Sequence, residues 1–324
     1  MARILLTHSP EALALYYGER ALKGLQGLGE VKLHEGKEPL QGEQLIRAAE
    51  SCEIIVSYRQ SPGPAEVFQR LPMLVAFVRC AIDIRNIDVA AASKAGVLVT
   101  QASAGFVTSV AEMVLGFMVD LSRGITRSTM DYRAGRGPKA AMGKELRGST
   151  LGVIGYGAIG REVSRMGKAL GMRVLVNDPY VKDVEQTSFD ELLRQSDYVV
   201  PLATATSETE NLMNAAAFAK MKKSAFFINV SRGNLVDEPA LEAALDAGRL
   251  AGCAMDVGRA PDQMPTPRLA ARRDVIATPH AAGLTVPAIE HQSLETVAQA
   301  GEILKGRSPK GAVNAEHWTR KVKG

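Results

Sequence analysis

Two hydrophobicity patterns alternate along this chain. Short apolar runs, such as Ile54-Ile55-Val56 and Val97-Leu98-Val99, are separated by longer stretches in which apolar residues recur at helical spacing. Unbroken apolar runs of this length are typical of parallel strands, which are buried on both faces. The first third of the chain therefore predicts strands at 3–6, 31–34, 53–57, 74–80 and 97–100, and helices at 11–25, 43–49 and 87–94.

A second alternating series begins at Ser149. It predicts strands at 150–154, 173–177, 198–202, 225–230, 252–257 and 274–277, with helices at 159–170, 189–195, 215–220 and 238–247. Strands that alternate with helices form βαβ units, so we expect an α/β fold with a doubly wound parallel sheet. A last helix at 286–304 would return to the first domain. The expected domains are a nucleotide-binding domain of residues 103–287 and a discontinuous domain of residues 1–102 and 288–324.

The segment that joins the two series predicts one long helix. Ser109-Val110-Ala111-Glu112 has the capping-box pattern, in which Ser109 and Glu112 bond the first unpaired amides of a helix. Apolar residues then recur at helical spacing as far as Ile125. Residues 133–148 are polar and basic and contain glycine, which favours an exposed connecting loop.

Composition narrows the class of protein. The 324 residues, 46% hydrophobic and 23% charged, are typical of a globular chain of about two domains. A net charge of +4 from scattered basic residues gives no nucleic-acid footprint. Cys52, Cys80 and Cys253 are too far apart for a disulfide framework or a paired metal motif, and indicate reduced thiols in a cytoplasmic protein. No segment is apolar enough to predict a membrane span or a signal peptide.

A glycine-rich turn follows the first strand of the second series. Gly155-Tyr156-Gly157-Ala158-Ile159-Gly160 is G-x-G-x-x-G between an apolar strand and an amphipathic helix, the context of a dinucleotide site. Asp178 ends the next strand, 18 residues after Gly160, where a carboxylate accepts bonds from ribose hydroxyls and repels a 2′-phosphate. The interpretation is an NAD site. The alternative is a turn that needs glycine only for packing.

Two further residues with catalytic chemistry follow buried strands. Arg232 lies in Asn229-Val230-Ser231-Arg232-Gly233, and His280 follows Thr278-Pro279. Ligands of doubly wound sheets bind at the carboxyl ends of the strands, so both residues could converge beside the nicotinamide. Arginine can hold a carboxylate and histidine can exchange a proton, which suits reversible oxidation of a 2-hydroxy acid. A surface ion pair for Arg232 and a turn role for His280 are the alternatives.

At this point the chain resembles a known family, the D-isomer-specific 2-hydroxyacid dehydrogenases, which include phosphoglycerate dehydrogenase. The resemblance covers nearly the whole chain, and its motifs occur in the family's order. They are Asn86-Ile87-Asp88, Ser109-Val110-Ala111-Glu112, Leu151 to Gly160, Asn177-Asp178-Pro179-Tyr180, Asn229 to Gly233, Ala254-Met255-Asp256-Val257 and Thr278-Pro279-His280.

The resemblance implies a flavodoxin-like substrate domain and a Rossmann-like NAD domain, with the active site in the cleft and a homodimer built on the NAD domains. It makes Arg232 the substrate-binding arginine, His280 the acid/base and Asp256 the partner of the nicotinamide carboxamide. The remaining residues expected to line the cofactor are Ala158, Ile159, Thr209, Val230 and Gly283.

The chain departs from the family pattern beside the histidine. The family orients its histidine with a glutamate five residues after the aspartate that matches Asp256, and here that position is Pro261. Asp262 is the expected substitute carboxylate and is included in the catalytic set with Arg232 and His280. Gln263 is the other candidate, since an amide could orient the imidazole, as in the formate dehydrogenase branch. A third possibility is that neither side chain contacts His280.

The substrate segment departs as well. Where the family usually has a glycine-rich turn, this chain has Cys80-Ala81-Ile82-Asp83, and we expect the backbone of Ala81 and Ile82 to bind the substrate carboxylate. Arg59 falls near the family's substrate-contacting segment and could bind a distal acidic group; the alternative is a solvated surface role. Phe106 and Ala203 replace an asparagine and a histidine common in the family, which makes the pocket more apolar.

Three functions are compatible with these features. The leading hypothesis is an NAD-dependent dehydrogenase that acts on a D-2-hydroxy acid or its 2-oxo acid, with no metal, nucleic-acid or membrane partner. Formate oxidation is suggested only by the missing glutamate. A cofactor-sensing protein similar to the co-repressors of this fold would bind NAD(H) without physiological turnover. The short tail after 304 predicts no appended regulatory domain.

Overall fold

The computed structural model describes residues 2–322, which divide into two compact units. Unit 1 comprises the chain up to Phe106 together with the chain from Leu284 onward, and unit 2 comprises Val107–Gly283. The chain passes between the units after residues 106 and 283, and each position is four residues from the boundary that the sequence predicted, after residues 102 and 287. Within the described residues no helix is both long and apolar enough to cross a bilayer.

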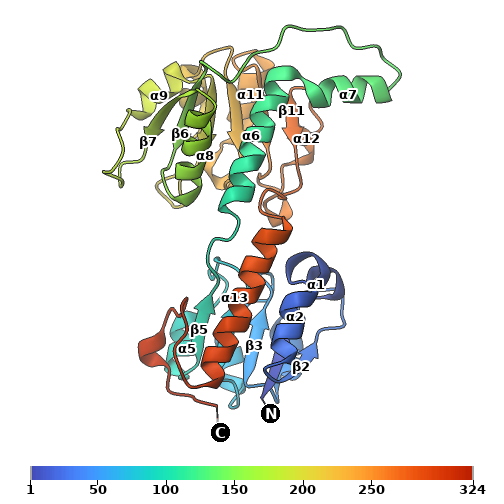
Figure 1. The fold of residues 1–324 in the computed structure, drawn as a ribbon, viewed down its shortest axis with the longest axis vertical. Helices are drawn as coiled ribbons and strands as arrows, with labels where there is room; N and C mark the ends of the chain where they lie inside the picture. Colours follow the sequence, from blue (N-terminus) through green and yellow to red (C-terminus); the bar gives the residue numbers. More distant parts are fainter. Residues whose placement is uncertain (1, 323–324) are drawn as a thin grey trace. The chain divides into compact units, whose positions relative to one another are not determined.

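Unit 1 is built on a parallel sheet with the strand order β2-β1-β3-β4-β5 (Figure 1). Its described strands are β1 (Arg3–Leu6), β2 (Glu30–Leu33), β3 (Ile54–Ser57), β4 (Ala76–Arg79) and β5 (Leu98–Gln101). Its described helices are α1 (Pro10–Tyr16), α2 (Glu19–Gln26), α3 (Gly42–Ala49), α4 (Ala65–Arg70), α5 (Val89–Lys94) and α13 (Val286–Leu304), followed by a 3-10 turn at Ala315–His317.

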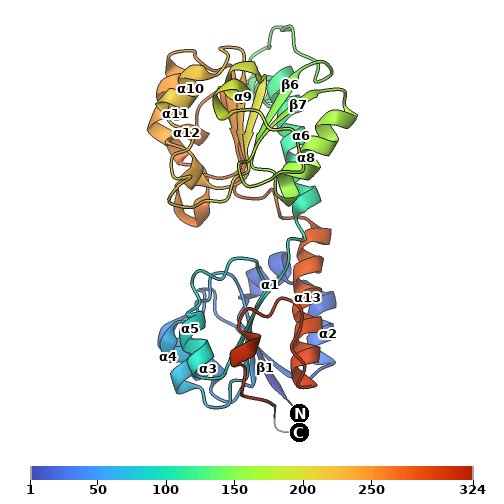
Figure 2. The same cartoon turned by 90° about the vertical axis from the view of Figure 1, so that its left-hand side faces the viewer.

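Helices cover both faces of this sheet (Figure 2). α13 and α2 lie on one face and α3, α4 and α5 on the other. Each face has its own apolar core, one around Ile4, Val56 and Ile303, the other around Leu5, Ile55 and Phe77. The alternation along β1 and β3 sends successive side chains to opposite faces, which explains why the apolar runs 4–6 and 54–56 are fully buried.

Unit 2 is a second parallel sheet, with the order β11-β10-β9-β8-β6-β7. Its described strands are β6 (Thr150–Ile154), β7 (Arg173–Asn177), β8 (Tyr198–Pro201), β9 (Phe226–Asn229), β10 (Gly252–Met255) and β11 (Val275–Ala277). Its described α-helices are α6 (Val107–Arg123), α7 (Ile125–Arg133), α8 (Ala158–Ala169), α9 (Phe189–Gln195), α10 (Ala215–Lys220), α11 (Glu238–Asp246) and α12 (Pro267–Ala270), with 3-10 turns at Gly233–Leu235 and Pro261–Gln263.

The chain order along this sheet reverses at β6, because β7 and β8 pair with opposite edges of it. α6 and α8 pack on one face and α9 to α12 on the other (Figure 2). The expected α/β fold with a doubly wound parallel sheet is thus confirmed. In such sheets a ligand crevice opens at the carboxyl ends of the strands, beside the reversal.

Local structure differs from the sequence prediction at three helices. The helix expected at 11–25 is two helices, because Gly18 has a φ of 82° and ends α1. Gly124, with a φ of 64°, likewise separates α6 from α7. The capping box is wrong, since α6 begins at Val107 and Ser109 lies inside its first turn. The sequence reading also missed α4.

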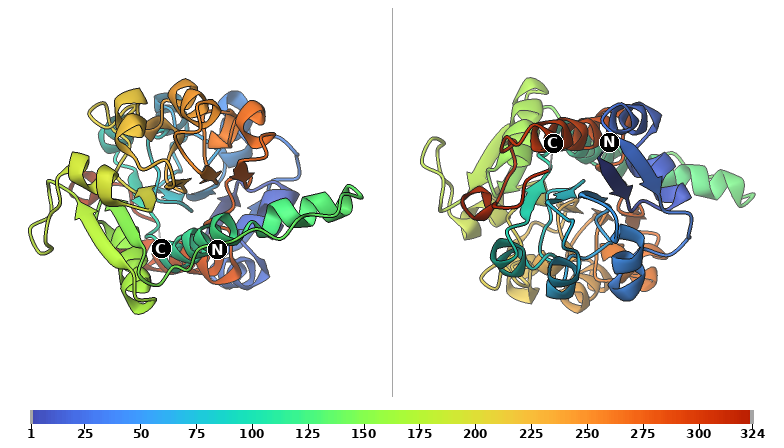
Figure 3. Two further views of the ribbon diagram at one scale, coloured as in Figure 1. Left: turned by 90° about the horizontal axis from the view of Figure 1, so that it is seen from above. Right: turned by 90° about the horizontal axis from the view of Figure 1, so that it is seen from below.

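α7 projects away from the rest of unit 2 (Figures 1 and 3). It is attached at its far end by Asp131, which forms ion pairs with Arg136 and Arg273, each at 2.7 Å. These two guanidinium groups hold the pKa of the Asp131 carboxyl below its usual value, the bond from Arg136 being the main cause. Ile125, Met130 and Tyr132 are exposed on this helix.

Candidate active site at the carboxyl edge of unit 2

The glycine-rich turn leads from β6 into α8 at the reversal of the sheet. Gly155 has a φ of 96°, and a Cβ there would lie 2.5 Å from the amide nitrogen of Ala203. Gly157 is the N-cap of α8 and has no side chain to cap it, and a Cβ at this position would meet no atom within 4 Å. No side chain at position 157 covers the N-terminus of α8, whose first amides include those of Ala158 and Ile159 and which is the positive end of the helix dipole. This cradle fits a pyrophosphate.

Asp178 lies beside this turn. Its Oδ2 accepts a hydrogen bond from the amide of Tyr156 (2.7 Å), and its Oδ1 accepts one from the amide of Tyr180 (3.0 Å). Two backbone amides thus orient the carboxylate at the end of β7, next to the glycine-rich turn. A carboxylate in this place can accept bonds from the hydroxyls of a ribose.

Arg232 follows β9 on a turn that an asparagine side chain organises. Asn229 accepts a bond from the amide of Ser231 (3.1 Å) and donates one to the carbonyl of Arg232 (3.0 Å). The Arg232 guanidinium donates to the carbonyl of Ser231 (2.8 Å). Next along the chain, a Cβ at Gly233 would lie 2.0 Å from the Gly258 carbonyl oxygen, so only glycine lets the loops after β9 and β10 approach this closely.

His280 follows β11 on a turn that the buried Asp256 holds. One Asp256 oxygen, Oδ1, accepts bonds from the Thr278 hydroxyl and the Ala281 amide, and Oδ2 accepts a bond from the Ala282 amide. The His280 amide donates to the Asp256 carbonyl (2.9 Å), and His280 itself has a φ of 55°. Asp256 therefore positions the histidine turn. Its expected contact with the nicotinamide stays a prediction.

The imidazole of His280 contacts the loop after β10. Its Nδ1 lies 2.8 Å from the backbone carbonyl oxygen of Asp262. Because a carbonyl can only accept, Nδ1 carries the hydrogen of this bond. The sequence predicted that the Asp262 carboxylate, or the Gln263 amide, would orient the ring. The contact that the structure provides comes from Asp262, through its main chain.

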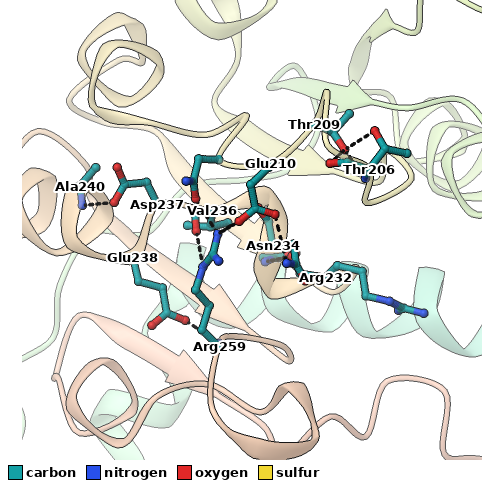
Figure 4. A network of polar contacts seen from close by, with 12 residues as sticks. Thr206, Thr209, Glu210, Arg232, Asn234, Val236, Asp237, Glu238, Ala240 and Arg259 are labelled. Atoms are coloured by element: carbon teal, nitrogen blue, oxygen red, sulfur yellow. Dashed lines mark hydrogen bonds and ion pairs between the residues drawn. The ribbon is translucent and has the colours of Figure 1, made fainter. Parts of the chain in front are cut away.

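Arg259 anchors this loop, and the sequence reading did not identify it. Its guanidinium forms an ion pair with Glu210 (2.8 Å) and donates to the carbonyls of Asn234 and Val236 (Figure 4). Its amide donates to the buried carboxylate of Glu238 (2.9 Å). In the same view the Arg232 side chain extends away from this cluster. The position of Arg259 between Asp256 and Asp262 was the only sequence signal for this role.

The remaining cofactor candidates lie on the same edge of the sheet. The Thr209 hydroxyl donates to the Thr204 carbonyl (2.6 Å) and accepts from the Thr206 amide (2.8 Å), which closes the loop after β8 (Figure 4). Val230 follows β9 and is buried, and Gly283 follows the His280 turn. Loops from β6, β7, β8, β9, β10 and β11 thus bring the predicted cofactor and catalytic residues of unit 2 to one edge.

The substrate candidates of unit 1 lie at the carboxyl edge of its own sheet. Arg59 follows β3, with its guanidinium carbon 5.5 Å from the ring centroid of Tyr16 and 6.0 Å from that of Tyr58. Ala81 and Ile82 follow β4, where the Ala81 carbonyl accepts a bond from the Ala102 amide (3.1 Å). Ile82 is exposed. Their contact with a substrate stays a prediction.

Burial determines the reactivity of the three cysteines. Cys52, Cys80 and Cys253 are buried and unpaired, and burial raises the pKa of each thiol, that of Cys80 to about 12. A raised pKa leaves little thiolate for nucleophilic attack. Among residues 2–322, no three His, Cys, Asp or Glu side chains are grouped so that they could hold a metal ion.

Residues 115–282 match the model of the NAD-binding domain of the D-isomer specific 2-hydroxyacid dehydrogenases. The chain belongs to this family. The family prediction is therefore confirmed, and unit 2 is the NAD-binding domain of the chain. The cradle at Gly157 and the carboxylate of Asp178 are the features of this member that fit NAD.

Relatives of this dehydrogenase-family chain include enzymes with several named substrates. It is 35% identical over 288 residues to a D-3-phosphoglycerate dehydrogenase of Archaeoglobus fulgidus, an alignment that covers 86% of this chain and 55% of the relative. It is 30% identical over 273 residues to a hydroxypyruvate reductase of Thermotoga maritima, with 82% and 89% covered. The chain thus spans about half the length of the phosphoglycerate dehydrogenases it matches and most of the reductase.

Solved structures of the family share the fold over the whole chain. The D-lactate dehydrogenase of Escherichia coli, 27% identical, superposes with a TM-score of 0.81, and the alignment covers 97% of this chain and 100% of that enzyme. A D-lactate dehydrogenase of Treponema pallidum, 26% identical, gives the same TM-score, 0.81.

Proposed function

We propose that this protein transfers a hydride between NAD(H) and a D-2-hydroxy acid or its 2-oxo acid. The observation that carries the proposal is the placement of Arg232, Asp256 and His280 at the carboxyl ends of β9, β10 and β11, which are neighbours in the NAD-binding sheet. Arg232 supplies a guanidinium that can bind a carboxylate, and His280 supplies an imidazole that can transfer a proton, at the sheet edge where the cofactor crevice is expected.

In the direction of reduction, NADH supplies the hydride that reaches C2 of the 2-oxo acid. Arg232 binds the substrate carboxylate through a charge-assisted fork and polarises the C2 carbonyl. His280 donates the proton from Nε2 to the carbonyl oxygen, because Nδ1 is engaged with the Asp262 carbonyl. Oxidation reverses the proton step, and the neutral ring then accepts the proton at Nε2.

Unit 1 is proposed to determine which acid is used. Arg59, Ala81 and Ile82 lie on loops after β3 and β4, at the carboxyl edge where ligands of parallel sheets bind. Arg59 is the residue proposed to bind an acidic group at the far end of a substrate. The names of the relatives suggest hydroxypyruvate, 3-phosphohydroxypyruvate and pyruvate as compounds to test.

The test is a panel of 2-oxo acids, including glyoxylate, hydroxypyruvate, 3-phosphohydroxypyruvate and pyruvate, reduced with NADH and with NADPH. Arg232→Ala is expected to raise KM and lower kcat/KM by roughly 30-fold or more, the effect of losing a charged partner. His280→Ala is expected to lower kcat by about 10²- to 10⁴-fold. Wild-type turnover in either variant would remove that residue from the mechanism.

The cofactor-sensor alternative makes the opposite prediction in the same assay. A sensor would bind NADH at the Gly157 cradle but reduce no acid of the panel at an enzymatic rate. Formate oxidation, which the missing glutamate suggested, stays an alternative; the group bonded to Nδ1 of His280 is the Asp262 carbonyl and not the Gln263 amide, which does not favour it. Adding formate and NAD to the panel tests it directly.

The homodimer that the resemblance implies is also part of the proposal. Ile125, Met130 and Tyr132 are exposed on α7, and Met142 is fully exposed in the loop that follows. Exposed apolar side chains on a projecting helix are typical of an association surface. Light scattering is expected to give a dimer mass for the wild type and a monomer mass for a Met130→Glu, Tyr132→Lys double variant. A monomeric wild type would contradict this part.

A further inference from the structure

The loop after β10 has an uncommon backbone. Asp262 and Gln263 both have left-handed conformations, with φ values of 56° and 57°. Consecutive left-handed residues other than glycine are sparsely populated, and they persist only where the surrounding structure holds them. They fall at the place where this chain lacks the family's glutamate, immediately after Pro261.

Backbone hydrogen bonds within the loop, together with Arg259, hold this conformation. The Gly258 amide donates to the Gln263 carbonyl (2.8 Å), and the Ala260 amide donates to the Met264 carbonyl (3.0 Å). Arg259 connects the start of the loop to Glu210 and to the Val236 carbonyl. The loop is therefore fixed on both sides of the two left-handed residues.

The left-handed pair determines the direction of one carbonyl. The torsions on either side of the peptide bond between Asp262 and Gln263 turn the Asp262 oxygen to within 2.8 Å of Nδ1 of His280. A carbonyl accepts only, so it selects the imidazole tautomer with hydrogen on Nδ1 and a lone pair on Nε2. That is the tautomer which the proton step at Nε2 requires.

The Gln263 side chain does not take this role. Its Oε1 is buried and has no hydrogen-bond partner among residues 2–322, whereas the carbonyl of the residue before it contacts the ring. Replacement of a carboxylate by a backbone dipole removes the need for any particular side chain at the position of the missing glutamate. It transfers the requirement to the backbone torsions of residues 262 and 263.

We propose that the left-handed Asp262–Gln263 pair is the positioning element for His280, with the Asp262 carbonyl in the place of the family's glutamate. The proposal deepens the proposed function and rests on it for its kinetic consequence. Its structural content, the bond to Nδ1 and the tautomer that follows, does not depend on which acid is the substrate.

The first experiment measures the tautomer directly by ¹⁵N NMR of histidine-labelled protein. The chain has five histidines, so the His280 signals are assigned by their loss in His280→Gln. In the neutral ring we expect a protonated, hydrogen-bonded Nδ1 and an unprotonated Nε2. A ring with its hydrogen on Nε2, or a mixture of both tautomers, would overturn the proposal even if the protein reduces oxo acids well.

Backbone variants at residue 263 supply the second experiment. Glycine tolerates a positive φ, so we expect Gln263→Gly to keep the Nδ1 signature and to lower kcat by no more than about threefold. Valine is β-branched and disfavours a positive φ, so Gln263→Val should lose the signature, and its kcat should fall by roughly 10- to 100-fold. Met264→Val is the matched control, because it places the same side chain next in sequence at an ordinary φ of −71°. KM for NADH should be unchanged in all three.

Asp262→Asn separates the carbonyl from the carboxylate. This variant keeps the main chain and tolerates a left-handed conformation, so the Nδ1 signature is expected to persist. If Asp262→Asn abolishes the signature while Gln263→Val retains it, the carboxylate orients the ring and the proposal is wrong. If no panel acid is reduced but the NMR signatures follow the expected pattern, the proposed function fails and the positioning assignment stands.

Discussion

Asp256 is the residue on which the histidine turn depends most directly. It is fully buried, and its two carboxylate oxygens accept bonds from the Thr278 hydroxyl and from the amides of Ala281 and Ala282. Charge-assisted bonds to a buried carboxylate are stronger than bonds between neutral groups. One side chain therefore fixes the segment that carries His280, independently of any contact that it makes with a cofactor.

Asp256→Asn tests this role. The substitution places an NH₂ donor against groups that themselves donate, which should cost about 1–3 kcal/mol in the free energy of unfolding of unit 2 and lower kcat. Chemical denaturation and steady-state kinetics measure the two effects. Asp183→Asn, which breaks an exposed ion pair with Arg161, is the control and should change stability by less than about 1 kcal/mol. Equal stability of both variants would contradict the assignment.

Asp178 carries a second prediction at the residue scale. Removal of its carboxylate in Asp178→Ala takes away the acceptor for the ribose hydroxyls and the charge that repels a 2′-phosphate. NADH binding should weaken roughly 10- to 100-fold, the range for a charged hydrogen bond, while NADPH binding should improve. Titration of both cofactors by fluorescence gives the ratio, and an unchanged NADPH/NADH ratio would disprove the ribose argument.

Buried Arg79 at the end of β4 connects several elements of unit 1. Its guanidinium donates to the carbonyls of Tyr58 (2.6 Å) and Ser61 (3.1 Å) and to Oδ1 of Asn86 (2.6 Å). These acceptors lie on the loop after β3 and on the segment before α5. Burial lowers the pKa of the guanidinium to about 10, yet the group stays charged at neutral pH. Arg79 therefore holds in place the two loops that carry Arg59, Ala81 and Ile82.

Arg79→Met should uncouple these loops. The variant leaves the buried carbonyls of Tyr58 and Ser61 without a donor, which is expected to cost about 2 kcal/mol or more in the unfolding of unit 1, and it frees the more exposed Oδ1 of Asn86. It should also raise KM for the 2-oxo acid, with KM for NADH unchanged. Arg79→Lys, which keeps the charge but cannot reach all three acceptors, should fall between the wild type and Arg79→Met. A methionine variant as stable as the wild type would show that the loops hold themselves.

Each unit of the molecule has its own sheet and its own apolar core, so we expect each to have its own stability. Trp318, the single tryptophan, is buried in unit 1 and donates its Nε1–H to the Val75 carbonyl (3.1 Å). Tryptophan fluorescence therefore reports the unfolding of unit 1. His8 lies in the same unit, buried between the rings of Tyr17 and Tyr58, with no hydrogen-bond partner for either ring nitrogen among residues 2–322.

His8 should make unit 1 sensitive to acid. Burial, with a smaller effect of Arg79, lowers the pKa of His8 from 6.5 to about 3. Below 6.5 the unfolded chain therefore binds a proton that the folded unit does not, and stability falls as the pH drops towards 3. Between about pH 7 and pH 5 the expected loss is about 2 kcal/mol, measured by urea unfolding with Trp318 fluorescence.

Two variants check the origin of this pH dependence. His8→Phe and His8→Gln carry no titrating ring, so the decrease of stability between about pH 7 and pH 5 should shrink by about 2 kcal/mol in both, whatever their stability at neutral pH. His34→Gln, which removes a half-buried histidine of the same unit, is the control and should keep the wild-type slope. An unchanged slope in the His8 variants would assign the acid sensitivity to other groups.

The sequence by itself determined the two parallel sheets, because a buried parallel strand leaves an unbroken apolar run such as Ile54-Ile55-Val56. It also determined the family and the place of the glycine-rich turn, Asp178, Arg232 and His280. Each of these follows a strand, and the carboxyl ends of parallel strands lie at one edge by geometry alone. The type of side chain, together with its position shortly after a predicted strand, was enough to predict that these residues lie at that edge.

Only the tertiary structure decided what holds them. Strand order depends on pairing between segments far apart in sequence, and the breaks at Gly18 and Gly124 depend on backbone torsions that an apolar pattern does not encode. The partner of His280 could not be found from residue types, because a backbone carbonyl is present at every position. Its direction at Asp262 comes from two left-handed torsions that distant contacts of Arg259 stabilise.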